Sequence, residues 1–163
     1  MIRNTCFLAI ALLALSCKST PSSKERARTD SSKLSAPPPF KPGFGEFMAS
    51  IQVHHEKLYF AGKNHNWALA DFEMHEIGEA IDNLKIYCTD RPETAKLPMI
   101  GPPLDSVAAS VSRQDSTAFF RHFSYLTQAC NDCHQATDHG FNRIVLPTRP
   151  PFSNQDFRPV NGR

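Results

Sequence analysis

The chain has 163 residues, of which 40% are hydrophobic and 21% are charged, and its formal net charge at pH 7 is +2. This length and composition are typical of one folded domain of ordinary size and exclude a wholly disordered chain. So small an excess of Lys and Arg cannot neutralise a run of phosphates, which argues against a nucleic-acid partner.

The first 17 residues predict a secretory signal peptide. Arg3 lies in a short polar start, an apolar run follows over residues 7–15, and Cys17 comes directly after Ser16. An apolar run this short cannot span a bilayer as a permanent helix, and the order of these features is typical of export signals. We therefore expect residues 1–17 to direct export.

Cys17 is the predicted site of lipid attachment. Residues 14–17 read ALSC, which resembles the cleavage box of bacterial lipoproteins, although Ala14 stands where a larger aliphatic residue is usual. The resemblance implies a membrane-tethered lipoprotein that is periplasmic or associated with the outer membrane, since Lys18 rather than an aspartate follows the cysteine. Simple cleavage after Ser16, without a lipid, is the alternative.

Residues 18–42 predict a flexible linker between the signal and the folded domain. The segment is rich in Ser, Lys and Pro and has almost no apolar residues. It cannot bury enough surface to offset the entropy lost on ordering. We expect the folded domain over residues 43–140 and an irregular Pro-rich tail over residues 141–163.

Apolar periodicity predicts four helices in this domain. Apolar residues recur at steps of three and four over residues 44–58, 67–88, 104–111 and 119–133, which places them on one face of each helix. Prolines separate the second helix from a shorter third one, and a proline is expected in the first turn of that third helix. One short run with strand propensity, at residues 143–147, does not make a sheet. The pattern therefore predicts an all-α protein built as an antiparallel four-helix bundle.

Acidic residues on the second helix show no catalytic pattern. Glu73, Glu76 and Glu79 recur every three residues, but the apolar stripe of this helix runs through Met74 and Ile77. We therefore expect the three carboxylates on a solvated face. No catalytic residue is predicted, and we expect the protein not to be an enzyme.

The pair Cys130 and Cys133 differs from the other cysteines because a histidine follows it at once. Cys88 falls on an apolar stripe and is expected to be a small buried hydrophobic residue. Residues 130–134 read CNDCH, which is the C-x-x-C-H pattern of c-type haem attachment. On one helix the two cysteines can reach the vinyl edge of one porphyrin, and His134 can present its imidazole to the iron.

Two other chemistries use pairs of cysteines. A thiol–disulfide pair normally opens a helix, where the helix dipole lowers the thiol pKa, whereas this pair lies near the end of a predicted helix. A zinc site would need further ligands such as His122 or His139, which lack the paired spacing of structural zinc sites. Both chemistries stay open as alternatives to haem.

The order of a signal, a four-helix bundle and a C-x-x-C-H motif on the last helix resembles the cytochrome c-prime family and its low-spin relatives. The resemblance covers about residues 43–140, and CNDCH is its one specific motif. It implies one covalent haem c (heme c), with thioethers on Cys130 and Cys133 and with His134 as the proximal ligand. Asp138 stands where many members have a basic residue. The tail continues past the motif, and we expect it to pack as an irregular strap over the bundle or the haem edge, with a disordered tail as the alternative.

A single covalent haem on an exported, membrane-tethered domain suits one-electron transfer. The expected function is therefore that of a monohaem c-type cytochrome whose redox partner the sequence does not identify. The alternative is a five-coordinate haem that binds nitric oxide or another small gas, as the resemblance implies. A structural lipoprotein stabilised by its haem is a third class. The resemblance is also consistent with a homodimer.

Met48 is the predicted sixth ligand of the iron. In an up-and-down bundle the first and fourth helices are antiparallel neighbours, so His134 lies level with the start of the first helix, where Met48 is one turn in. A thioether ligand also raises the potential of a carrier. The alternatives are Met48 as ordinary core packing beside an open iron, and His54 or His55 as the ligand.

Overall fold

The computed structural model describes residues 40–160. The predicted signal over residues 1–17, the lipid site at Cys17 and the linker as far as residue 39 lie outside the described residues.

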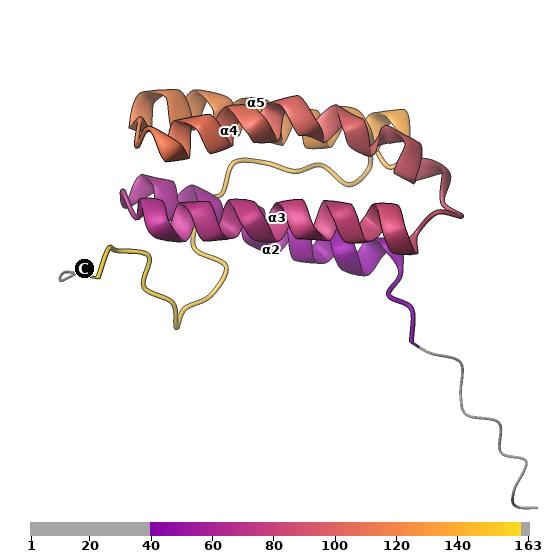
Figure 1. The fold of residues 1–163 in the computed structure, drawn as a ribbon, viewed down its shortest axis with the longest axis horizontal. Coiled ribbons are helices and arrows are strands. Elements are labelled where there is room, and N and C mark those ends of the chain that lie inside the picture. The colour runs from indigo at the N-terminus through magenta and orange to yellow at the C-terminus, as the bar shows by residue number, and fades with distance from the viewer. Residues whose placement is uncertain (1–39, 161–163) are drawn as a thin grey trace, which may run out of the picture. The chain divides into compact units, whose positions relative to one another are not determined.

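Four α-helices and one 3-10 helix make up the described domain. Their bounds are α2 Phe44–Lys63, α3 Trp67–Tyr87, η2 Pro92–Ile100, α4 Gly101–Ser112 and α5 Ser116–Ala136. α2 packs antiparallel to α3, and α4 packs antiparallel to α5 (Figure 1). The prediction of an all-α protein with four helices in antiparallel pairs is confirmed. Residues 40–160 contain no β-strand, and none of their helices has both the length and the apolar character needed to cross a membrane.

The segment before the third helix differs from the prediction. The third helix, predicted with proline in its first turn and apolar residues from residue 104, is α4 and begins at Gly101, whereas the sequence pattern does not predict η2 over Pro92–Ile100. Prolines lie in the first turn of both helices, Pro92 in η2 and Pro102 in α4. A first turn tolerates proline because its N–H groups have no partner within the helix. Pro92 and Pro102 thus stand at the starts of helices, whereas Pro98 lies inside η2.

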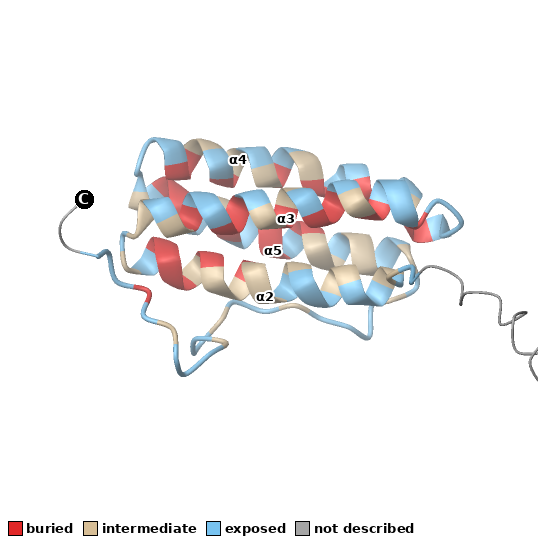
Figure 2. Cartoon of the chain, turned by 60° about the horizontal axis from the view of Figure 1, so that its bottom comes forward, coloured by how far each residue is buried: buried red, intermediate tan, exposed pale blue. Residues whose placement is uncertain are grey.

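The main core lies where the inward faces of the four helices meet (Figure 2). Leu58 of α2, Ile77 of α3 and Phe123 of α5 are among its largest fully buried side chains. Gly62 lets α2 approach α5 closely, because a Cβ atom at this position would lie 2.2 Å from the ring of Phe119. Close packing therefore fixes the end of α2 against the start of α5.

A smaller apolar cluster lies toward the other end, where α2 begins. Leu84 and Cys88 are buried there with Leu97 of η2, and Met48 of α2 packs against them. The expected burial of Cys88 is confirmed. This cluster forms part of the surroundings of the candidate site.

Residues 137–160 form an irregular strap that runs back along the bundle from the end of α5 (Figure 1). The side chain of Asn131 on α5 makes two hydrogen bonds to one residue of the strap. It accepts from the Ile144 N–H at 2.8 Å and donates to the Ile144 carbonyl at 2.9 Å. Further along, Phe157 is buried against Phe60, with ring centroids 5.7 Å apart. The tail is therefore packed on the bundle as far as it is described.

Glu73 corrects the expectation of a solvated acidic face on α3. Its side chain is 1% exposed, because His54 of α2 donates from Nδ1 to its Oε2 at 2.6 Å and the Lys57 ammonium lies 3.9 Å from Oε1. The strap covers this region, since the Lys57 ammonium also lies 5.5 Å from the centre of the Phe152 ring. Glu79 is exposed, as expected. A buried carboxylate that accepts a hydrogen bond and lies near a cation can be retained in a core.

Candidate functional site

A cavity of about 380 Å³ lies at the end of the bundle where α2 begins and α5 ends. All four residues predicted for the site line it: Met48, Cys130, Cys133 and His134. The structure thus brings together one side chain from the start of α2 and three from the end of α5. Further residues of α2, from Phe44 to His55, line the cavity as well, and η2 and the strap supply the other walls, together with single residues of α3 and the loop after it.

The helical spacing of α5 explains why its three site residues share this cavity. Cys130 and Cys133 are three positions apart, and His134 is four positions from Cys130, so all three fall on neighbouring parts of one helix face. Both cysteines are partly buried against the main core. The helix ends at Ala136, after which the His139 N–H donates to the His134 carbonyl at 2.7 Å and the chain turns into the strap.

The strap orients His134. Its Nδ1 lies 2.6 Å from the carbonyl oxygen of Asn142, and a carbonyl can only accept a hydrogen bond, so Nδ1 carries the hydrogen. In the neutral ring, Nε2 then has the free lone pair. Histidines that bind metals commonly donate their other ring N–H to a backbone carbonyl or carboxylate in this way. Sequence reasoning missed Asn142, because its carbonyl comes from an irregular segment without any periodic signal.

The two thiols are held in their neutral form. Burial, together with the smaller effect of the neighbouring Cys133, raises the pKa of Cys130 to about 11. Burial also raises the pKa of Cys133. A thiol–disulfide redox pair depends on a lowered thiol pKa at the start of a helix, and these thiols lie in the last two turns of α5. The geometry therefore does not favour redox disulfide chemistry.

The zinc alternative also finds little support. Within residues 40–160, no group of three or more His, Cys, Asp or Glu side chains is arranged to hold a metal ion. His122 faces α4 instead, where its Nδ1 lies 2.7 Å from the Ser110 hydroxyl. His139 does line the cavity, at 4.0 Å from a carboxylate oxygen of Glu93.

A contact between α2 and α5 sets the level of Met48. Nε2 of His55 lies 2.9 Å from the hydroxyl of Thr127. α2 and α5 run in opposite directions, so the start of α2 and the end of α5 lie at the same end of the bundle (Figure 1). Seven residues from His55 toward the start of α2, and seven from Thr127 toward the end of α5, therefore cover the same distance along the bundle axis in the same direction. These steps reach Met48 and His134. The two residues are therefore level with each other across the cavity.

His55 contributes a buried acceptor to the same cavity. The Thr127 hydroxyl donates its one hydrogen to the Phe123 carbonyl at 2.9 Å, so it accepts from His55 Nε2–H. Burial lowers the pKa of His55 to about 4, which keeps the ring neutral and leaves Nδ1 with a lone pair. Nδ1 is buried and has no hydrogen-bond partner within the described residues.

Charged residues lie on the side of the cavity formed by η2 and the strap. Arg91, in the loop between α3 and η2, donates to both carboxylate oxygens of Glu93, from Nη2 at 2.7 Å and from Nε at 3.3 Å. The side chain of Arg91 is 49% exposed, whereas that of Glu93 is 10% exposed. Arg91 is the one Lys or Arg among the residues that line the cavity.

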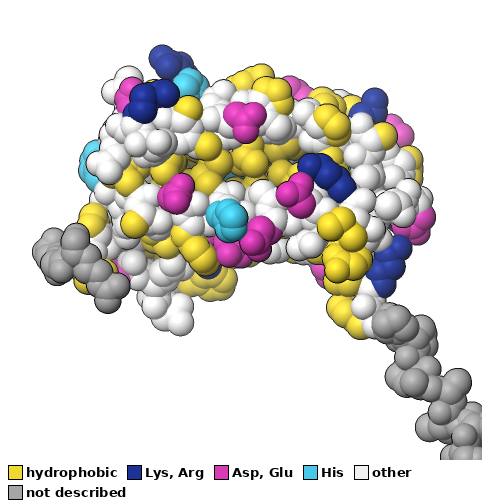
Figure 3. Space-filling view, viewed as in Figure 1, with side chains coloured by type: hydrophobic (Ala, Val, Ile, Leu, Met, Phe, Trp, Pro, Cys, Tyr) yellow, Lys and Arg dark blue, Asp and Glu magenta, His cyan; other side chains and the backbone are white. Residues whose placement is uncertain are grey.

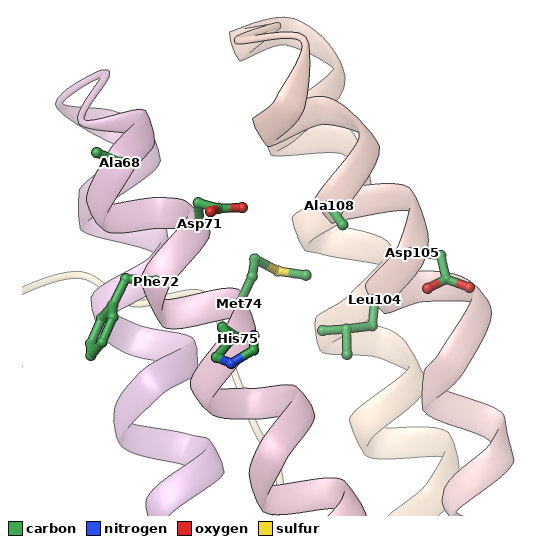
Figure 4. Close-up of a pocket in the computed structure, with 8 residues that line it drawn as sticks. All are labelled: Ala68, Asp71, Phe72, Met74, His75, Leu104, Asp105 and Ala108. Carbon is green, nitrogen blue, oxygen red and sulfur yellow. The ribbon is translucent and has the colours of Figure 1, made fainter.

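A second hollow, an open groove of about 510 Å³, lies between α3 and α4. Met74 and Leu104 point toward one another across it, with Asp71 and Asp105 beside them (Figure 4). The space-filling view shows apolar side chains along the floor of this hollow (Figure 3). None of the residues predicted for the site lines it.

Comparison with known proteins adds no relative. No family model matches the chain, and no curated protein or solved structure matches it either.

Proposed function

We propose that this protein is an exported monohaem c-type cytochrome that acts in one-electron transfer. Cys130 and Cys133 would carry the thioethers of a covalent haem, and His134 would bind the iron through Nε2. The observation that carries the proposal is the orientation of His134, whose Nδ1–H donates to the Asn142 carbonyl while its Nε2 stays free beside the two cysteines.

The size and lining of the cavity support this proposal. Its volume of about 380 Å³ lies in the range of ligand and cofactor sites. Apolar side chains line its interior: Ile51, Ile81, Leu97 and Ile100. Nδ1 of His55 is buried without a hydrogen-bond partner, and such an acceptor costs free energy. This also supports a bound group in the cavity.

The haem would supply a one-electron iron couple when bound. Two features of the chain would act on this iron. The Asn142 carbonyl fixes the plane and the tautomer of the His134 ring, and the apolar walls lower the local dielectric. Both factors act on the potential of haem iron, through hydrogen bonding to the ligand and through the local dielectric. A carrier of this kind needs no catalytic residue.

Met48 is the proposed sixth ligand. It lies level with His134 across the cavity, as the contact between His55 and Thr127 indicates. Met48 also packs against the cluster of Leu84, Cys88 and Leu97, as an ordinary core residue would. This observation favours a second candidate function, gas binding. In that case the iron would be five-coordinate, and binding of nitric oxide or another small gas would be the function.

Spectra of the exported protein, oxidised and reduced, test the proposal. Haem should stay with the wild-type protein after extraction with acidified solvent, and substitution of both Cys130 and Cys133 with Ala should make it extractable. Cys88→Ala is the matched control and should keep the haem bound. His134→Ala should change the Soret band. A protein without haem, or an unchanged spectrum in His134→Ala, would contradict the assignment.

The sixth ligand is tested separately. A low-spin oxidised protein with a near-infrared charge-transfer band from methionine–iron ligation, lost in Met48→Ala, would support electron transfer. A high-spin protein that binds nitric oxide readily would replace that function by gas binding.

Membrane tethering is part of the proposal. Cys17, at the end of the predicted signal, would carry the lipid, and Lys18 after it favours the outer membrane. Cys17→Ser should release the protein in soluble form. A wild-type protein that is wholly soluble and carries no acyl mass at its N-terminus would contradict this part.

A further inference from the structure

Haem carries two propionate groups, and their carboxylates need a partner when the ring enters an apolar cavity. Burying an unpaired carboxylate is costly, whereas a carboxylate paired with arginine forms short, charge-assisted hydrogen bonds. A cationic side chain in the lining of the cavity would pair with such a carboxylate.

We infer that Arg91 binds a haem propionate. The inference rests on the proposed function. Arg91 is the one Lys or Arg side chain that lines the cavity, and it is half-exposed, so it could bind a propionate at the edge of the cavity. The isoleucine and leucine walls would then hold the apolar part of the ring. Arginine is also the cation whose planar fork matches a carboxylate.

Arg91 has hydrogen bonds left for this task. A guanidinium has five N–H groups, and two of them, on Nε and Nη2, are directed at Glu93. Within residues 40–160, the Arg91 side chain makes no hydrogen bond to any other residue. Three N–H groups therefore remain, including both on Nη1, and these can meet a second carboxylate while Glu93 keeps its own pair.

The position of Arg91 is fixed in advance. Its backbone N–H donates to the Cys88 carbonyl at 3.1 Å, and its carbonyl accepts from the Thr94 N–H at 3.2 Å. The Thr94 hydroxyl donates to the same Cys88 carbonyl at 2.6 Å. Glu93, itself nearly buried, then holds the guanidinium at the cavity. A fixed partner loses less conformational entropy on binding than a free surface arginine does.

The experiment uses the full-length chain with Cys130 and Cys133 both replaced by Ala, so that covalent attachment does not mask affinity. The affinity of this protein is measured for haem and for haem dimethyl ester, whose two carboxylates are methylated. Arg91→Gln should weaken haem binding by about tenfold to a hundredfold, the effect of a lost hydrogen bond to a charged group, and leave ester binding unchanged. Arg113→Gln, at the end of α4, is the matched control and should change neither.

The outcomes separate the inference from the proposed function. If the chain binds haem and Arg91→Gln changes both affinities equally, or neither, the inference about Arg91 is wrong and the proposed function stands. If the exported wild-type protein carries no haem, both are wrong. If it carries haem but the doubly substituted protein binds neither haem nor its ester, the midpoint potential of the haem-loaded protein decides the inference about Arg91.

A second measurement uses the protein with its cysteines intact and its haem attached. Arg91→Gln should lower the midpoint potential, because it removes a positive charge from the lining of the haem cavity, whereas Arg113→Gln should not. An unchanged potential in Arg91→Gln would overturn the inference.

Discussion

Acid should destabilise the folded chain through His55. The residue is 3% exposed, and burial lowers its pKa from 6.5 to about 4. Well above pH 6.5 the ring is neutral in both the folded and the unfolded chain, so it makes no contribution to pH dependence. Between pH 6.5 and pH 4 the unfolded chain binds a proton that the folded chain does not. The free energy of unfolding therefore falls as the pH falls through this window.

The size of the effect follows from the two pKa values. The full loss, reached below pH 4, is about 3 kcal/mol, since each tenfold ratio in proton affinity corresponds to about 1.4 kcal/mol. Between pH 7 and pH 5 the same linkage gives about 2 kcal/mol. This is a large part of the stability of a small domain.

Urea denaturation at pH 7 and pH 5 measures this loss. The wild type should lose about 2 kcal/mol of unfolding free energy through His55 between pH 7 and pH 5. His55→Gln should lack this loss, because it has no group that titrates at this position. His75→Gln is the matched control, since His75 is exposed on α3, and it should behave as the wild type. Equal pH dependence in His55→Gln and the wild type would refute the reasoning.

Two further predictions concern packing and the strap. Gly62→Ala should destabilise the fold by about 1–3 kcal/mol, because its Cβ would overlap the Phe119 ring; Gly78→Ala, with open space around its Cβ, should be neutral or stabilise α3 by up to about 1 kcal/mol, as thermal denaturation can measure. Asn131→Ala removes both hydrogen bonds to Ile144 and should cost about 1–3 kcal/mol. Limited proteolysis should then cut the strap sooner, and an unchanged cleavage rate would contradict its role.

The helices were predictable because their apolar stripes follow the helical period. The stripe that ends at Cys133 continues into His134, so the position of the three α5 residues on one face followed from spacing alone. The pairing of Met48 with the end of α5 followed from the up-and-down order of four helices. These features depend on local periodicity and on chain direction, which a single sequence contains.

Other features depend on partners that are distant in the chain and leave no periodic signal. Glu73 has the polarity of a surface residue, and its burial depends on His54 and Lys57, which approach it from α2. Asn142 contributes a backbone carbonyl, which carries no side-chain signature at all. Arg91 lies in a loop next to prolines, and its place at the cavity follows from the unpredicted η2.

The strap has a consequence for how the protein matures. His134 obtains its partner from Asn142, and this carbonyl is synthesised after the C-x-x-C-H motif. A chain crossing a membrane from its N-terminus therefore delivers both cysteines and the histidine before the segment that orients the ring. In the proposed cytochrome, an attachment enzyme would meet the motif before the strap is in place, and docking of residues 137–160 would then be the last step of assembly. A chain that ended at residue 140 would retain every residue needed for attachment and lack the group that sets the tautomer of the ligand.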